Sequence, residues 1–277
     1  MENLADKLVS YNWINAGQLN AAKQDASKTG KSVWSCLVKL GHLSEEDIAI
    51  FFSQESGIAY VRVDDYELDR EILCLVNEAF CRQHAVIPVF KIKNVLYVAC
   101  SNPLDTGVID GLSRLSGCEV EPLIASSRSI LAALDICFGP EDENFLLDGF
   151  LFRQNPLQGL SFYRESQRLA LSIPAGIKVL DKSVRLHCSS IEGYTRNISS
   201  NGKAINLQVS VFLPRGISVS LELKPQKTLL TAGEIIKAFG EVIYCNVEKV
   251  QRYSLAVKFI NIAQDDLEKL LKLANNS

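Results

Sequence analysis

The chain has 277 residues, of which 29 are Lys or Arg and 32 are Asp or Glu, so its formal net charge is −3. Hydrophobic residues make up 47% and charged residues 22%, a composition that excludes a disordered or fibrous protein. No uncharged apolar stretch approaches the roughly 18–20 residues that span a bilayer, and the first residues lack the basic and apolar regions of a signal peptide. We therefore expect a soluble, cytoplasmic protein of two domains, without membrane insertion.

Charge is distributed unevenly along the chain. Residues 1–150 contain 12 Lys or Arg and 22 Asp or Glu, a net charge of −10, whereas residues 151–277 contain 17 and 10, a net charge of +7. This asymmetry predicts two modules with different partners, and the basic module should favour an anionic ligand such as a nucleotide, a nucleic acid or a membrane surface. The alternative is solvated surface charge without a function.

The first half predicts an α+β organisation in two parts. Residues 1–56 read as helices in which a helix–turn–helix pattern occurs twice, as KLVSYNWINAGQL and CLVKLGHLSEEDI, with a period of about 29 residues. Residues 57–138 predict a small α/β unit, with strands at 86–90 and 95–101, a helix at 105–117, a strand at 118–125 and a Ser-capped helix at 126–139. The acidic stretch that follows predicts a linker at 139–154.

The last 120 residues predict a mostly β domain. Short runs rich in β-branched residues alternate with turn residues, which indicates an antiparallel sandwich or a small barrel. The predicted strands fall at 177–180, 184–194, 202–209, 217–224, 238–250 and 253–260. The amphipathic stretch at 263–274 predicts a closing helix that plugs or flanks the barrel.

Signatures of catalysis and metal binding do not appear in the sequence. Gly30-Lys31-Ser32 resembles the end of a phosphate-binding loop, but Asp25 stands where the first glycine is needed, and no strand precedes it. Three scattered histidines cannot complete a metal site with the irregularly spaced cysteines. We therefore expect that this protein is not an enzyme and that it has no catalytic residue, no bound metal and no cofactor.

The basic half contains a more specific constellation. Arg164 and Arg168 form R-x-x-x-R at the entrance to the β domain, and Asn197, Ser199 and Gly202 form N-x-S-x-x-G at a turn between two strands. In an extended chain, residues four apart point to the same side, so both guanidinium groups could contact one ligand. A guanidinium group matches the O6/N7 edge of guanine and also matches phosphate. Asn197 and Ser199 could read a base edge, and Gly202 permits positive φ and close approach of the backbone.

On these motifs, residues 155–277 resemble the PilZ domain, a bacterial receptor module for cyclic di-GMP. The resemblance also includes AFGEVIYC, YSLAVKFINI and the closing helix. It implies that Arg164 and Arg168 clamp guanine and phosphate, while Asn197, Ser199 and Gly202 hold the other base. Tyr163 stands where some members carry another arginine, so the resemblance leaves open whether one nucleotide or a stacked pair is bound.

Residues 1–138 resemble the N-terminal (MshEN-like) domain of type II secretion and type IV pilus assembly ATPases. The resemblance is carried by KLVSYNWI, CLVKLGHLSEEDIAIFFSQESGIAYV, HAVIPVF and LYVACSNPLDTGVIDGL. In some of these ATPases, tandem motifs beginning Arg-Leu-Gly bind cyclic di-GMP. The corresponding positions here read Asn3-Leu4-Ala5 and Ser32-Val33-Trp34, with Asn12 in place of a glycine, so we do not expect this half to bind the nucleotide.

Together these features predict a non-enzymatic cyclic di-GMP effector. Its PilZ half would bind the nucleotide, and its N-terminal half would contact a protein of pilus, secretion or signalling machinery, with effects on motility or biofilm behaviour. The alternative is a ligand-independent adaptor in which the barrel is only a protein-binding platform. A nucleic-acid partner is not expected, because the basic half lacks the interleaved aromatic residues of single-strand binders.

Overall fold

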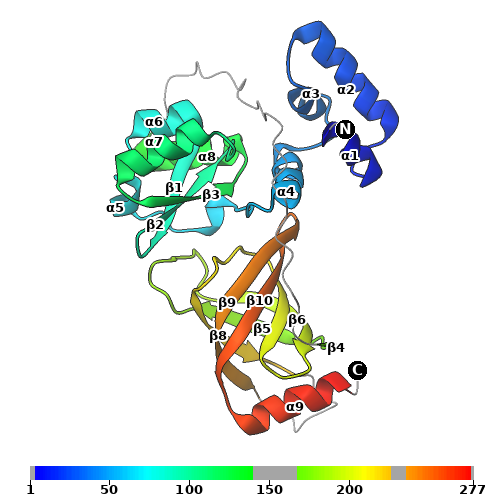
Figure 1. Cartoon of the computed structure of the whole chain (residues 1–277), viewed down its shortest axis with the longest axis vertical. Coiled ribbons are helices and arrows are strands. Elements are labelled where there is room, and N and C mark those ends of the chain that lie inside the picture. The colour runs from blue at the N-terminus through cyan, green and yellow to red at the C-terminus, as the bar shows by residue number, and fades with distance from the viewer. Residues whose placement is uncertain (1–3, 140–166, 226–234, 276–277) are drawn as a thin grey trace.

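The computed structural model describes residues 4–139, 167–225 and 235–275 (Figure 1). The predicted architecture is confirmed: a helical region and a small α/β unit are followed by an antiparallel barrel with a helix at its C-terminal end. Nearly all of the predicted linker at 139–154, and Arg164, lie outside the described residues.

The helical region consists of two helix pairs that repeat with the predicted spacing. Its helices are α1 (Leu4–Ser10), α2 (Ala16–Thr29), α3 (Val33–Lys39) and α4 (Glu45–Ser56). Capping boxes begin the second helix of each pair, at Asn15 for α2 and at Ser44 for α4. Asn12 and Gly41 occupy equivalent turns and both have positive φ, 59° and 68°. Asparagine tolerates this conformation, which explains how the first turn forms without a glycine.

Helix α4 joins the helical region to the rest of the molecule. Its Phe51 and Phe52 contact the rings of both tryptophans: Trp13 lies 6.1 Å from Phe51, and Trp34 lies 4.8 Å from Phe52, between ring centroids. Figure 1 shows α4 at the place where the helical region, the α/β unit and the barrel come together. The tryptophans therefore pack against the helix that contacts both other parts.

The α/β unit is built on a three-stranded sheet of order β1-β2-β3. β1 and β2 pair antiparallel, as a hairpin, whereas β2 and β3 are parallel and are connected through α7. The two short helices α5 and α6 were not predicted. The elements are η1 (Val63–Asp65), α5 (Arg70–Leu73), α6 (Glu78–His84), β1 (Val86–Ile92), β2 (Val95–Cys100), α7 (Thr106–Ser116), β3 (Glu119–Ile124) and α8 (Ser127–Phe138).

The C-terminal domain is a closed barrel rather than a sandwich. Six strands follow one another in the order β6-β5-β8-β9-β10-β7, and β7 pairs back with β6, while β4 extends the sheet at β6. The elements are β4 (Arg168–Ala170), β5 (Pro174–Val179), β6 (Ile191–Ser199), β7 (Ala204–Val209), β8 (Ser218–Leu223), β9 (Ile236–Lys249), β10 (Arg252–Ile262) and α9 (Gln264–Asn275). Helix α9 flanks the barrel near β4 and β6.

The prediction of a strand at 184–194 was wrong in its position. The strand begins at Ile191 and runs to Ser199, so Asn197 and Ser199 lie inside β6 rather than in a turn. The preceding residues pair with the α/β unit instead: the backbone N–H of Glu67 donates to Arg185 O (3.1 Å), and that of His187 donates to Asp65 O (3.2 Å).

This pairing belongs to a buried contact between the α/β unit and the barrel. The rings of Tyr60 and Tyr253 are nearly parallel with centroids 6.5 Å apart, and the Tyr66 hydroxyl donates to the backbone carbonyl of Phe212. All three tyrosines are at most 2% exposed, and burial raises the pKa of each hydroxyl well above its ordinary value, so they remain neutral. The hydrophobic core is therefore continuous from one half of the chain to the other.

Among the described residues, no helix is both long enough and apolar enough to cross a bilayer. Within the same residues, no cluster of three or more His, Cys, Asp or Glu side chains could hold a metal ion.

Candidate functional site

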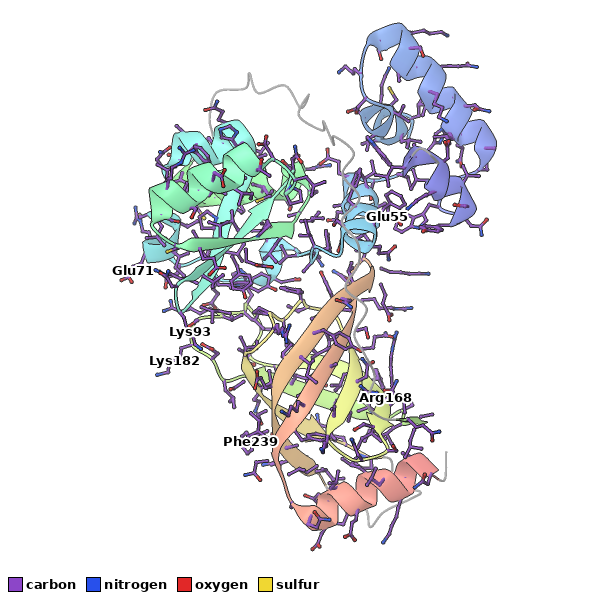
Figure 2. All side chains as sticks on the ribbon, viewed as in Figure 1. Glu55, Glu71, Lys93, Arg168, Lys182 and Phe239 are labelled. Carbon is purple, nitrogen blue, oxygen red and sulfur yellow. The ribbon has the colours of Figure 1, made fainter. Side chains whose placement is uncertain are left out.

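The motif residues that the structure describes come together where β4 joins β6. Arg168 pairs with Ser199 and Ala170 pairs with Asn197 in an antiparallel ladder. Two backbone hydrogen bonds extend this ladder, from Ser200 N to Gln167 O (2.9 Å) and from Leu171 N to Arg196 O (3.0 Å). Arg168 lies on the barrel, nearer to α9 than to the N-terminal half (Figure 2).

Ser199 and Gly202 shape the turn between β6 and β7. The buried Ser199 hydroxyl accepts a hydrogen bond from Ala204 N (2.9 Å), and Gly202 N donates to Ser199 O (2.8 Å). Gly202 has φ +65°, as its predicted role required, and a Cβ there would lie 2.9 Å from the side chain of Leu267 on α9. The close approach at Gly202 in this structure is therefore made by α9.

Two polar atoms of the site are buried without a hydrogen-bond partner among the described residues. They are Nη1 of Arg168, a donor, and Oδ1 of Asn197, an acceptor. Leaving such an atom unpaired costs about 1–3 kcal/mol, and buried polar groups in folded proteins are rarely left unpaired. A ligand that presents both an acceptor and a donor could pair both atoms.

The charge around the turn is positive. Lys203 follows Gly202 in the turn, and Lys258 of β10 pairs with Ala204 at the start of β7. Neither these lysines nor Arg168 has an ion-pair partner among the described residues. Lys258 stands opposite Glu241 in the β9–β10 ladder, whereas Arg168 and Lys203 have no acidic residue paired with them in the described ladders. The positive charge of Arg168 and Lys203 favours an anionic ligand.

Thr195, which no sequence motif marks, holds the site strands together. Its buried hydroxyl donates to Leu171 O (2.7 Å) and accepts from Ile173 N (2.9 Å), and its own N–H donates to Ile173 O (2.9 Å). These bonds fasten the chain to β6 at the gap between β4 and β5. A lone threonine inside an extended run gives no signal of such a role.

No sequence motif marks Arg196, the next residue, either. It is the extra residue of a β-bulge, because Thr195 pairs with Leu207 and Asn197 pairs with Asn206. Its guanidinium group binds the carboxylate of Glu248 with both terminal nitrogens, one at 2.6 Å, and also donates to Gln208 Oε1 (2.7 Å). The bulge therefore places a half-exposed ion pair directly beside Asn197.

A second polar cluster lies on the same outer face of the barrel. Asn206 is only 5% exposed, and its Nδ2 donates to the hydroxyl oxygen of Tyr244 (3.0 Å) and to Ser254 Oγ (3.1 Å). In the predicted strand at 202–209, Asn206 stands between Ile205 and Leu207, and this alternation was the only signal that it faces outward.

Comparison with known proteins identifies both halves of the chain. A family model of the MshEN domain matches residues 56–144, and a model of the PilZ domain matches residues 163–275. The fold and these matches define a two-module protein made of binding domains. In particular, the chain contains an MshEN domain followed by a PilZ domain, and both resemblances predicted from the sequence are confirmed.

The relatives match the N-terminal module. The type IV pilus assembly ATPase PilB of Myxococcus xanthus is 30% identical over 148 residues, which cover 52% of this chain and 26% of that protein. PilB of Pseudomonas aeruginosa is 24% identical over 138 residues, covering 50% and 24%. The chain thus spans about a quarter of the length of these curated relatives.

Two solved structures are also similar. MshE with cdg has a TM-score of 0.44 and 23% identity, covering 49% of this chain and 99% of that one. The Bacillus subtilis inhibitor of motility MotI/DgrA has a TM-score of 0.32 and 17% identity, covering 42% and 51%.

Replacing Gly202 tests how the turn packs on α9. Gly202→Ala forces a Cβ onto a left-handed backbone, which costs about 1–2 kcal/mol, and also pushes against Leu267. Gly216→Ala is the matched control, because Gly216 has φ +86° and nothing within 4 Å of the new Cβ. We expect Gly202→Ala to lower the free energy of urea unfolding more than Gly216→Ala does.

The difference between the two glycine variants should disappear when Leu267 is replaced by alanine. Equal losses for both variants in the otherwise unchanged protein would contradict the packing of α9 on this turn.

Proposed function

We propose that this protein is a non-enzymatic cyclic di-GMP effector whose PilZ domain binds the nucleotide at the β4–β6 site. One observation carries the proposal: in a chain that matches the PilZ family, Arg168 and Asn197 each present an unpaired buried polar atom from adjacent strands. Guanine offers O6 and N7 as acceptors for the arginine and N2–H as a donor for the asparagine.

The charges of the site support the same ligand. Cyclic di-GMP carries two phosphates, and Arg168 and Lys203 supply positive charge without an ion-pair partner among the described residues. Arg164, which lies outside the described residues, is proposed as the second arginine of the clamp. Ser199 and Gly202 contribute chiefly by fixing the turn that holds Asn197 in place.

The N-terminal half is proposed to contact a protein partner in the cytoplasm. Its similarity to the N-terminal part of PilB supports a component of type IV pilus or secretion machinery as that partner. An influence of the nucleotide on this contact requires two states of the molecule for which cyclic di-GMP has different affinities.

A chain of contacts offers a physical route for such coupling. Arg196, next to Asn197, holds the carboxylate of Glu248 near the end of β9. The backbone carbonyl of Glu248 accepts a hydrogen bond from Nε2 of Gln54 on α4 (3.1 Å). A shift of β6 on binding would therefore be transmitted to the helix that carries the N-terminal region.

Binding is tested by titration calorimetry of cyclic di-GMP into the full chain. Arg168→Ala removes a charged donor to the base, so it should weaken binding by roughly 1–3 kcal/mol, about 5- to 150-fold. Arg164→Ala should have an effect of the same size. Arg252→Ala is the control, because Arg252 is exposed at the opposite end of β10 from Lys258 and the site turn.

If the unchanged protein gives no binding heat, the proposal fails and the ligand-independent adaptor takes its place. If both arginine variants bind as tightly as Arg252→Ala, the site has been assigned to the wrong residues.

Coupling between the halves is tested by tryptophan fluorescence. The chain has two tryptophans, Trp13 and Trp34, and both pack against α4. We expect cyclic di-GMP to change their emission, after correction for absorption by the nucleotide, although no tryptophan lies in the barrel. Arg168→Ala should show the change only at the higher nucleotide concentrations that saturate it. If calorimetry shows binding but the tryptophan emission does not change, the proposed coupling between the halves is wrong and the proposed binding site still stands.

A further inference from the structure

The outer face of the barrel carries one row of residues that runs from β4 to β9. Pairing in register places its members, in spatial order, on β4, β6, β7, β10 and β9: Ala170, Asn197, Asn206, Ala256 and Tyr244. The orphaned Asn197 Oδ1 belongs to this row, so its neighbours along the row are candidates to touch whatever Asn197 binds.

Tyr244 reaches back along this row toward the site. Its hydroxyl oxygen lies 3.0 Å from Nδ2 of Asn206, although β10 separates their strands by two spacings of about 4.8 Å. The side chain must therefore extend across β10, where the row contains the small Ala256. Tyr244 is half-buried, so part of its side chain remains accessible.

The hydroxyl of Tyr244 is left with a proton to donate. Because its oxygen accepts from Asn206, its own O–H is free for an acceptor, and it makes no other hydrogen bond to the described residues. Asn206 is buried and uses its amide to hold Tyr244 and Ser254. Asn206 therefore fixes the position of the phenol.

β-Bulges flank the row on both sides. Arg196 is the extra residue before Asn197 on β6, and Ile243 is the extra residue before Tyr244 on β9, because Val257 pairs with Val242 and Ala256 pairs with Tyr244. Bulges of this kind re-aim the side chains beside them and are frequent next to functional sites.

We propose that the nucleotide site extends along this row: Tyr244 donates its hydroxyl proton to guanine O6 and offers its ring to the base, with Asn206 as a positioning residue. The inference rests on the proposed function, since it assigns further contacts to the same ligand. Because adenine has an amino donor in place of O6, the Tyr244 hydroxyl would favour guanine over adenine.

The test compares cyclic di-GMP with cyclic di-AMP by calorimetry on the full chain. Tyr244→Phe keeps the ring and removes the donor, so it should weaken cyclic di-GMP binding about 3- to 10-fold, the value of one neutral hydrogen bond. Tyr244→Phe should bind cyclic di-AMP as tightly as the unchanged protein does. The ratio of its affinities for cyclic di-GMP and cyclic di-AMP should therefore be smaller than in the unchanged protein. Tyr194→Phe is the matched control, because Tyr194 is an exposed tyrosine on β6 outside this row.

Asn206→Ala separates positioning from direct contact. If Asn206 acts through Tyr244, the double variant Asn206→Ala/Tyr244→Phe should bind no more weakly than the weaker-binding of the two single variants. Additive losses would overturn the positioning role. Should Asn206→Ala fail to fold, Tyr244→Phe still decides the assignment of Tyr244.

The outcomes distinguish this inference from the function on which it rests. If Arg168→Ala weakens cyclic di-GMP binding but Tyr244→Phe does not, the assignment of Tyr244 is wrong and the proposed function still stands. Absence of cyclic di-GMP binding by the unchanged protein would overturn both.

Discussion

Strand β6 pairs with three other strands, and this pairing holds the barrel and the candidate site together. One of its edges pairs with β7 and closes the barrel, while the other pairs with β5 along its first half and with β4 along its last three residues. Thr195 fills the gap between β4 and β5 with its own backbone and side-chain hydrogen bonds. Closure of the barrel and the positions of Arg168 and Asn197 therefore depend on one strand.

Strand β6 is also linked to the N-terminal half of the chain, which contacts the barrel at two places. Three buried tyrosines and a short pairing around residues 65–67 and 185–187 join the α/β unit to the barrel. The Arg196–Glu248 pair and Gln54 join the part of β6 that carries the candidate site to α4. Because both connections have polar atoms paired across them, defined contacts hold the described parts of the two halves together.

Most of the elements could be predicted because local patterns specify them. The strands at 86–92 and 95–100 are β-branched runs bounded by turn residues, and the capping box at Ser44 marks the start of α4. β4 has only three residues and no pattern of its own, since pairing with β6 creates it. The segment before Ile191 was predicted as a strand because it runs into a stretch rich in β-branched residues. In the structure it bends and makes one isolated bridge, from Leu186 to Tyr66 of the α/β unit, which no local pattern reveals.

The candidate site could also be predicted only in part, because motifs mark some of its residues and the fold alone brings the others together. Two short sequence motifs mark Arg168, Asn197, Ser199 and Gly202. The structure brings these residues together where β4 pairs with the end of β6 and in the turn that follows. Asn206 and Tyr244 are 38 positions apart, and only closure of the barrel through β10 brings them into contact. The lack of a hydrogen-bond partner for the buried polar atoms of Arg168 and Asn197 likewise results from packing, and no sequence motif indicates it.

Hydrogen–deuterium exchange of the full chain, with and without saturating cyclic di-GMP, shows directly whether the nucleotide binds at the β4–β6 site. With the nucleotide bound there, we expect slower amide exchange at residues 167–173 and 196–204, where β4, the end of β6 and the site turn lie. Slower exchange confined to the N-terminal helices, or no change anywhere, would contradict binding at this site.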